Sequence, residues 1–243
     1  MTDWKKFYNK TASQRDKSDN FKPIKIIGKR SDELIKEVQK HLKNGMRIID
    51  FGCGTGRHLI EIYRTTDKKV KMIGIDNSPG VIKIAKEKAK GIKDVSFLLM
   101  DAFKTKFKSN MFDIVMNRLG APLKSYNEIF RILKKNGLFI LFVSDKGDWK
   151  EVIGTFGFKE SLGLEQLNFI KNAGFKVIKI YKISSTQYYR NIEDLRKTIE
   201  TIPFKPQLDK KTFYKKFKEY ERKYKTYWGI KSSQKRLLII SKK

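Results

Sequence analysis

The sequence predicts an α/β fold, in which a doubly wound, mostly parallel sheet of seven strands carries a long insertion between strands six and seven. From Met46 onward, short apolar runs alternate with amphipathic helical patterns, and this alternation is typical of parallel strands joined by helical crossovers. The chain has 243 residues, of which 40% are hydrophobic, enough for one large core with additions. We therefore expect one main domain.

The elements follow in order along the chain. Buried strands are predicted over residues 46–51, 70–75, 95–100, 112–116, 138–144, 175–183 and 236–241. Helices are predicted over 31–42, 57–64, 78–90, 126–135 and 164–173, with Ser78 as an N-cap and Asn136-Gly137 and Gly174 as stop signals. The predicted organisation is an N-terminal lid and helix (1–40), a core (41–183), an insertion (184–234) and a last core strand (235–243).

A glycine-rich turn follows the first core strand directly. Gly52, Gly54 and Gly56 alternate there, and a helix begins just after them. Glycine suits such a turn because the backbone bends sharply and a ligand can approach it without meeting a Cβ. A dinucleotide fingerprint would need a third glycine at position 57, which is Arg57. The pattern therefore fits a nicotinamide or flavin cofactor poorly.

Polar side chains stand at the ends of four neighbouring strands. Asp50 lies at the end of the first strand, Asp76 closes the second, Asp101 follows the third and Asn117 follows the fourth. Ligands of open α/β sheets bind outside the carboxyl ends of the strands, where all four residues would project. A carboxylate at the end of the second strand can accept both hydroxyls of a ribose. These positions predict a nucleoside-containing ligand at this edge.

With these motifs, residues 46–144 resemble the class I, Rossmann-like methyltransferases of the type 11 group, which use S-adenosyl-L-methionine as cofactor. The resemblance implies that Asp50 and the glycine turn bind the methionine part, and that Asp76 holds the ribose. It also implies that Asn77, Ser78, Asp101 and Ala102 contact the adenine, and that Asn117 lies beside the sulfonium. The cofactor-binding residues predicted in this core are Asp50, Gly52, Cys53, Gly54, Gly56, Asp76, Asn77, Ser78, Asp101, Ala102 and Asn117.

The acceptor is less well defined by the sequence. A methyl group on a sulfonium is already activated, so alignment of the acceptor supplies much of the rate and no catalytic base is predicted. A pyrimidine C5 methyltransferase would need a cysteine near Asn117, but the single cysteine, Cys53, lies in the glycine turn as a small residue. Arg57 and His58 are predicted to have surface roles. In the N-terminal segment, Tyr8 is predicted as a lid residue over the cofactor.

The insertion contains a helical pattern that places Phe213, Phe217, Tyr220 and Tyr224 on one stripe, with lysines elsewhere. Two interpretations stay open: the stripe packs onto the domain, or it stacks on RNA bases. The segment from Ile192 to Phe204 loosely resembles the bacterial 23S rRNA guanine-N1 methyltransferases, whose four-cysteine zinc module is absent here.

The net charge of the chain indicates what kind of partner it could bind. Lys and Arg number 55 against 26 Asp and Glu, a net charge of +29, which favours a polyanion such as RNA, although a generic lysine-rich surface would produce the same excess. No apolar run reaches the length of a membrane span, and one cysteine with two histidines predicts no metal site and a reducing, cytoplasmic location. Three functions are carried forward: an RNA methyltransferase, a small-molecule methyltransferase with the insertion as a cap, and a non-catalytic protein that binds cofactor and RNA.

Overall fold

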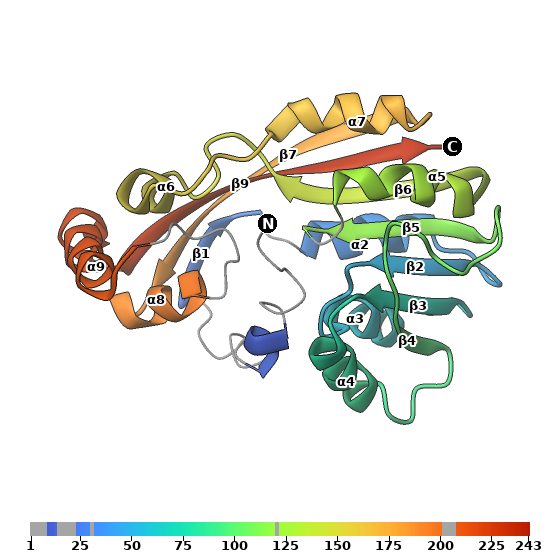
Figure 1. Cartoon of the computed structure of the whole chain (residues 1–243), viewed down its shortest axis with the longest axis horizontal. Helices are drawn as coiled ribbons and strands as arrows, with labels where there is room; N and C mark the ends of the chain where they lie inside the picture. Colours follow the sequence, from blue (N-terminus) through green and yellow to red (C-terminus); the bar gives the residue numbers. More distant parts are fainter. Residues whose placement is uncertain (1–8, 14–22, 30–31, 120–121, 201–207) are drawn as a thin grey trace. The chain divides into compact units, whose positions relative to one another are not determined.

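A computed structural model describes residues 9–13, 23–29, 32–119, 122–200 and 208–243 (Figure 1). The chain divides into two compact units. Unit 1 comprises residues 1–30, 144–162 and 182–236, and unit 2 comprises residues 31–143, 163–181 and 237–243. Two long strands, β7 (Lys176–Tyr189) and β9 (Gly229–Lys242), contribute one part of their length to each unit.

Unit 2 holds the parallel part of the sheet. Its other strands are β2 (Arg47–Phe51), β3 (Lys71–Asp76), β4 (Val95–Leu99), β5 (Phe112–Arg118) and β6 (Leu133–Ser144, of which Ser144 belongs to unit 1). The order across this unit is β7-β9-β6-β5-β2-β3-β4. The pairs β6–β5, β5–β2, β2–β3 and β3–β4 are all parallel, and β9 runs opposite to β6 (Figure 1). The predicted doubly wound α/β fold is confirmed.

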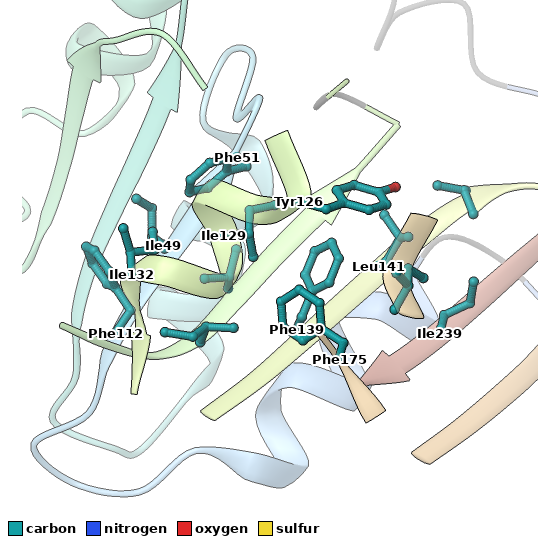
Figure 2. Close-up of a cluster of buried hydrophobic side chains, with 14 of the residues drawn as sticks. Ile49, Phe51, Phe112, Tyr126, Ile129, Ile132, Phe139, Leu141, Phe175 and Ile239 are labelled. Carbon is teal, nitrogen blue, oxygen red and sulfur yellow. The ribbon is translucent and has the colours of Figure 1, made fainter. Parts of the chain in front are cut away.

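In unit 2, α2 (Asp32–His41) precedes β2, and α3 (Arg57–Thr65), α4 (Pro79–Lys88), α5 (Tyr126–Ile132) and α7 (Gln166–Asn172) lie in the links between its strands. Short 3-10 turns, η2 (Leu123–Ser125) and η3 (Gly163–Glu165), lead into α5 and α7. The core on one face of the sheet joins Ile49 and Phe51 of β2 to Ile129 of α5 and to Phe139 and Phe175 (Figure 2). Because strand side chains alternate between faces, Asp50 belongs to the opposite face.

Four predicted boundaries were wrong. Helix α5 ends at Ile132, three residues before the predicted end, because Leu133 is extended (φ −70°, ψ 140°) and pairs with Phe112 of β5. Strand β6 therefore begins before Asn136, whose positive φ of 66° lies inside the strand. Strands β7 and β9 extend through Tyr189 and from Gly229, well into the predicted insertion.

Unit 1 contains β1 (Lys25–Gly28), α6 (Lys150–Phe156), α8 (Ile192–Glu200), α9 (Lys210–Tyr224) and β8 (Lys225–Thr226). Strand β1 pairs antiparallel with the distal part of β7, and β8 pairs antiparallel with β9. These two short strands bring the sheet to nine strands over the described residues, where seven were predicted. Within those same residues, no helix combines the length and apolar character that crossing a membrane requires.

The aromatic stripe of α9 lies inside the core of unit 1. The ring of Phe156 from α6 has its centroid 4.7 Å from that of Phe217 and 5.7 Å from that of Phe213. Tyr220 is fully buried, and its hydroxyl donates a hydrogen bond of 2.8 Å to the Lys231 carbonyl. Between the two interpretations of the stripe, the structure decides for packing: these aromatic rings hold α9 on α6 and are not available to stack on bases.

Buried polar contacts fasten the start of α6 to β9 within unit 1. Asp148 forms an ion pair with Arg236, and both side chains are about nine-tenths buried. The Glu151 carboxylate accepts hydrogen bonds from the Ser233 backbone N–H (2.9 Å) and hydroxyl (2.7 Å). Removing one member of such a buried pair would leave the other charge uncompensated, so these contacts fix the register of α6 against the strand.

Candidate functional site

The order of the strands reverses at β2, which pairs with β3 on one side and with β5 on the other. Such a switch point opens a crevice beyond the carboxyl ends of the two strands, and ligands of open α/β sheets bind there. Phe51 of β2 lies opposite Asn117 of β5 in the register, and the buried Asn117 amide Nδ2 donates a 3.0 Å hydrogen bond to the Phe51 carbonyl. Asn117 therefore ties the ends of the two strands together.

The glycine turn follows at this point with three left-handed residues, Gly52, Gly54 and Gly56, whose φ angles are 74°, 54° and 76°. A Cβ on Gly56 would lie 2.4 Å from the Phe97 ring, so this position needs glycine both for conformation and for space. A Cβ on Gly54 would have no neighbour within 4 Å. The middle of the turn thus presents bare backbone to open space, as close approach of a ligand requires.

Asp50 is the most strongly perturbed acid of this site. Its side chain is 2% exposed, and its Oδ1 atom is buried without a hydrogen-bond partner. Burial, followed by the negative charge of Asp76, raises the pKa of Asp50 to about 7, while the nearby Arg118 opposes the shift. A buried carboxylate oxygen without a partner is costly. It is well suited to receive a cationic or N–H donor from a ligand.

The carboxylate of Asp76 ties the turn to the helix after β3. Its Oδ2 accepts a hydrogen bond of 3.1 Å from the Gly54 N–H, and its Oδ1 accepts one of 3.0 Å from the Ser78 N–H. Ser78 is buried at the N-cap of α4, as predicted, with Pro79 at the first helical position. Asp76 thus bridges the glycine turn and α4, and with Asp50 it makes this end of the sheet strongly acidic.

The remaining predicted positions lie around this group with different exposure. Asn77 and Asp101 are exposed, and Asp101 Oδ1 accepts a hydrogen bond of 2.8 Å from the Phe103 N–H within its own turn. Ala102 is half-buried and packs against the core. The structure therefore brings Asp50, the glycine turn, Asp76 and Asn117 together, with Asn77, Asp101 and Ala102 at the ends of β3 and β4. Tyr8 lies outside the described residues.

Two further residues belong to this neighbourhood and were not predicted. His58, predicted at the surface, is partly buried, and its pKa falls to about 3 because burial and the charges of Arg118 and Arg57 disfavour the imidazolium. Arg118 ends β5 directly after Asn117, with its guanidinium carbon 5.8 Å from the Phe142 ring centroid. The sequence signal for Arg118 was its position after Asn117, and that for His58 was its place at the start of the helix after the glycine turn, where a surface role was predicted.

The single cysteine of the sequence, Cys53, is a buried free thiol in the glycine turn. The Cys53 side chain is buried, and burial with the negative charges of Asp50 and Asp76 raises the pKa of its thiol, which therefore stays protonated. Over the parts of the chain that the structure describes, no group of three or more His, Cys, Asp or Glu side chains could hold a metal ion. Among these residues, the groups that the site presents are acidic side chains and backbone N–H and C=O groups.

The fold and this group of residues define a Rossmann-like domain with acidic side chains at its switch point, and comparisons with known proteins indicate its class. Residues 42–152 match the model of a protein family described as "Methyltransferase domain". An uncharacterized protein of Methanocaldococcus jannaschii is 29% identical over 61% of this chain and 55% of its own length. The demethylmenaquinone methyltransferase of Staphylococcus aureus is 30% identical over 43% of this chain and 46% of its own.

Among solved structures, the [4+2]-cyclase SpnF superposes with a TM-score of 0.68 at 19% identity, over 100% of this chain and 96% of that one, which shows a shared fold. The chain spans about half the length of the curated relatives it matches. It carries a class I, Rossmann-like methyltransferase domain of the S-adenosylmethionine-dependent type, and the resemblance stated from its motifs is confirmed. The looser resemblance to the 23S rRNA enzymes stays a prediction.

Proposed function

We propose that unit 2 binds S-adenosyl-L-methionine at the carboxyl ends of β2 to β5, and that the protein transfers the cofactor's methyl group to an RNA. The observation that carries the first part is the buried Oδ1 of Asp50, which has no hydrogen-bond partner inside the protein. An ionised carboxylate at this depth needs a positive partner. The amino group of the cofactor's methionine part is such a partner.

The other residues of the site fit the same ligand. The open backbone at Gly54 leaves room for a ligand against the turn, and a carboxylate at the end of β3, such as that of Asp76, can accept the hydroxyls of a ribose. The cofactor supplies a methyl group that is activated by the positive sulfonium. The chain's own residues bind and orient, since alignment of acceptor and methyl group accounts for much of the rate in such transfers. We assign no catalytic base.

An RNA base or ribose as acceptor is supported by charge. The net charge of +29 creates a field that attracts polyanions. The outer face of α9 is basic, since Lys211, Lys215 and Lys218 are exposed while the aromatic stripe of the same helix is inside the core. A solvated row of cations suits phosphate contacts. The aromatic stripe of α9 packs in the core of unit 1 and therefore does not support RNA binding.

A small-molecule acceptor is the second candidate, because the Staphylococcus aureus relative is named for demethylmenaquinone. It predicts a cavity lined by the aromatic residues of the insertion. The cavity of about 240 Å³ in unit 1 has a different lining, which consists of Ile27, Lys150, Ser184, Ser185, Thr186, Ser233, Gln234 and Lys235. Hydroxyl and ammonium groups suit an anionic ligand and not an apolar ring, so we place the RNA acceptor first.

The test is transfer from labelled S-adenosylmethionine into separated RNA, protein and metabolite fractions of a cell extract. We expect label in RNA that is released by ribonuclease, and none with an Asp50→Asn variant shown by circular dichroism to be folded. Label in the metabolite fraction alone would establish the small-molecule candidate. Absence of transfer to every fraction, with cofactor binding intact, would support the non-catalytic alternative and overturn the proposal.

A further inference from the structure

The turn between β8 and β9 has an unusual composition. Thr226 pairs with Gly229 and Lys225 with Ile230, so the two residues of the loop are Tyr227 and Trp228. Two-residue hairpin loops favour Asn, Asp and Gly, because these residues tolerate positive φ. At Gly229, where φ is 113° and a Cβ would lie 2.2 Å from the Tyr189 carbonyl oxygen, glycine is needed. Turn geometry does not account for the two aromatic residues.

These aromatic residues are exposed on a turn that is held by hydrogen bonds. Tyr227 is 98% exposed and Trp228 is 43% exposed. The Thr226 hydroxyl accepts a hydrogen bond of 3.2 Å from the Trp228 N–H and donates one of 2.8 Å to the Gly229 carbonyl. The Tyr227 ring therefore contributes almost nothing to packing, although the backbone that carries it is fixed. An exposed aromatic ring on a hydrogen-bonded turn is accessible to a flat partner, and the backbone that carries it need not be ordered on binding.

Trp228 is held in place beside it. The Lys25 ammonium lies 3.4 Å from the centroid of the Trp228 ring, and the Tyr188 ring meets it edge-on with centroids 5.4 Å apart. These two contacts fix the orientation of the indole while leaving part of it exposed. The first contact also places a cation of β1, the Lys25 ammonium, beside the hairpin.

Positive charge surrounds the turn. Helix α9 ends at Tyr224 and runs straight into β8, so the exposed Arg222, Lys223 and Lys225 flank the hairpin. Residues 208–231 contain nine Lys and Arg against three acids, Asp209, Glu219 and Glu221. Exposed rings among cations are the combination that binds single-stranded nucleic acid, with bases stacked on the rings and phosphates beside the cations.

We propose that the hairpin tip (Lys225–Gly229), with Arg222 and Lys223, is a binding surface for single-stranded RNA, in which Tyr227 stacks on an unpaired base. This inference rests on the proposed RNA acceptor and names the surface that would hold it. An anionic membrane also attracts lysines and aromatic rings. The tip carries no Leu, Ile, Val or Phe to insert between acyl chains, so RNA is the better fit.

The test uses the full chain and a fluorescein-labelled oligo(A) strand, with binding followed by anisotropy. Tyr227→Ala is expected to raise Kd about tenfold, the effect of losing one base stack, whereas Tyr227→Phe keeps the ring and stays near the wild type. Phe169→Ala is the matched control, since Phe169 is a 44% exposed aromatic residue on α7, outside both the tip and the basic face of α9. Replacing Lys223 and Lys225 by Ala should make the slope of log Kd against log salt shallower by about 1.4.

The outcomes separate this inference from the proposed function. Unchanged Kd in folded Tyr227→Ala, or no binding of oligo(A) by the wild type, overturns the surface even where the transfer assay labels RNA. The transfer assay alone decides whether RNA is the acceptor. Vesicles of phosphatidylglycerol serve as the competing ligand: if Tyr227→Ala weakens vesicle binding and leaves oligo(A) binding unchanged, the tip is a membrane contact and the inference fails.

Discussion

Acid should weaken binding of the cofactor through a single carboxyl group. Asp50 is buried with its Oδ1 unpartnered, and its pKa in the unliganded protein is about 7. A protonated Asp50 cannot accept the positive amino group of the cofactor as a carboxylate would. Binding of the cofactor should therefore release the proton, and affinity should fall as the pH falls below the pKa of Asp50.

The size of the effect follows from that pKa. At pH 7 about half of the unliganded molecules carry an ionised Asp50, and at pH 5 about one in a hundred does. Kd for S-adenosylmethionine should thus rise about 50-fold from pH 7 to pH 5, or about 2.3 kcal/mol. Between pH 5 and pH 7 the amino group of the ligand stays protonated, so the pH dependence of Kd comes from a group of the protein.

Isothermal titration calorimetry in two buffers of different ionisation enthalpy would measure both the affinity and the proton released. Asp50→Asn should bind weakly and without pH dependence. The free energy of unfolding of the unliganded protein should change in the opposite direction and rise as the pH falls. Because the folded pKa of Asp50 lies above its ordinary value of 3.8, ionisation costs the unliganded protein up to about 4 kcal/mol above pH 7, a cost that disappears toward pH 4. The variant should be the more stable protein at pH 8. A wild-type affinity that is level between pH 5 and pH 7 would refute this reasoning.

Three further perturbations follow from the same contacts. Asp76→Ala should weaken cofactor binding by roughly 1–3 kcal/mol in calorimetry, and an unchanged affinity would place the cofactor elsewhere. Gly56→Ala should lower the free energy of unfolding in urea by about 2–4 kcal/mol, because the backbone is left-handed and the new Cβ meets the Phe97 ring. Gly45→Ala, with φ of 83° and open space, is the control and should cost only about 1 kcal/mol; equal losses would contradict the steric argument. Phe217→Ala should lower the free energy of unfolding by about 3–5 kcal/mol in thermal or urea unfolding. The affinity of the folded variant for oligo(A) should stay unchanged, and a large loss of affinity would mean that the aromatic stripe contacts RNA.

The parallel core and the polar residues at its carboxyl edge were predictable because their signals are local. Fully buried strands appear as short apolar runs, and Ile48 and Ile49 have no exposed surface at all. Gly52, Gly54 and Gly56 are visible as glycines that must bend the chain, and their φ angles are all positive. An acid at the end of a strand, such as Asp76, can likewise be placed at the binding edge without knowledge of its neighbours.

The elements that were predicted wrongly depend on contacts between distant parts of the chain. The run after Ile132 continues a good helical pattern, yet Leu133 pairs with Phe112 in the sheet, and tertiary pairing outweighs helix propensity there. The distal parts of β7 and β9 are rich in Ser, Thr, Gln and Lys, so their sequence carries a weak strand signal. Arg118 and His58 were missed because their importance comes from mutual proximity, which the sequence does not contain.

The continuity of β7 and β9 through both units restricts how acceptor specificity could be exchanged between relatives. A chimera that replaced residues 184–234 as a cassette would cut both strands within their length and leave each remaining half to pair with foreign sequence. Junctions placed between Tyr189 and Ile192, and in the Tyr227-Trp228 turn, would exchange α8 and α9 while keeping both strands whole. The segment that could be exchanged between relatives is therefore the pair of helices α8 and α9, while β7 and β9 would stay in place to support it.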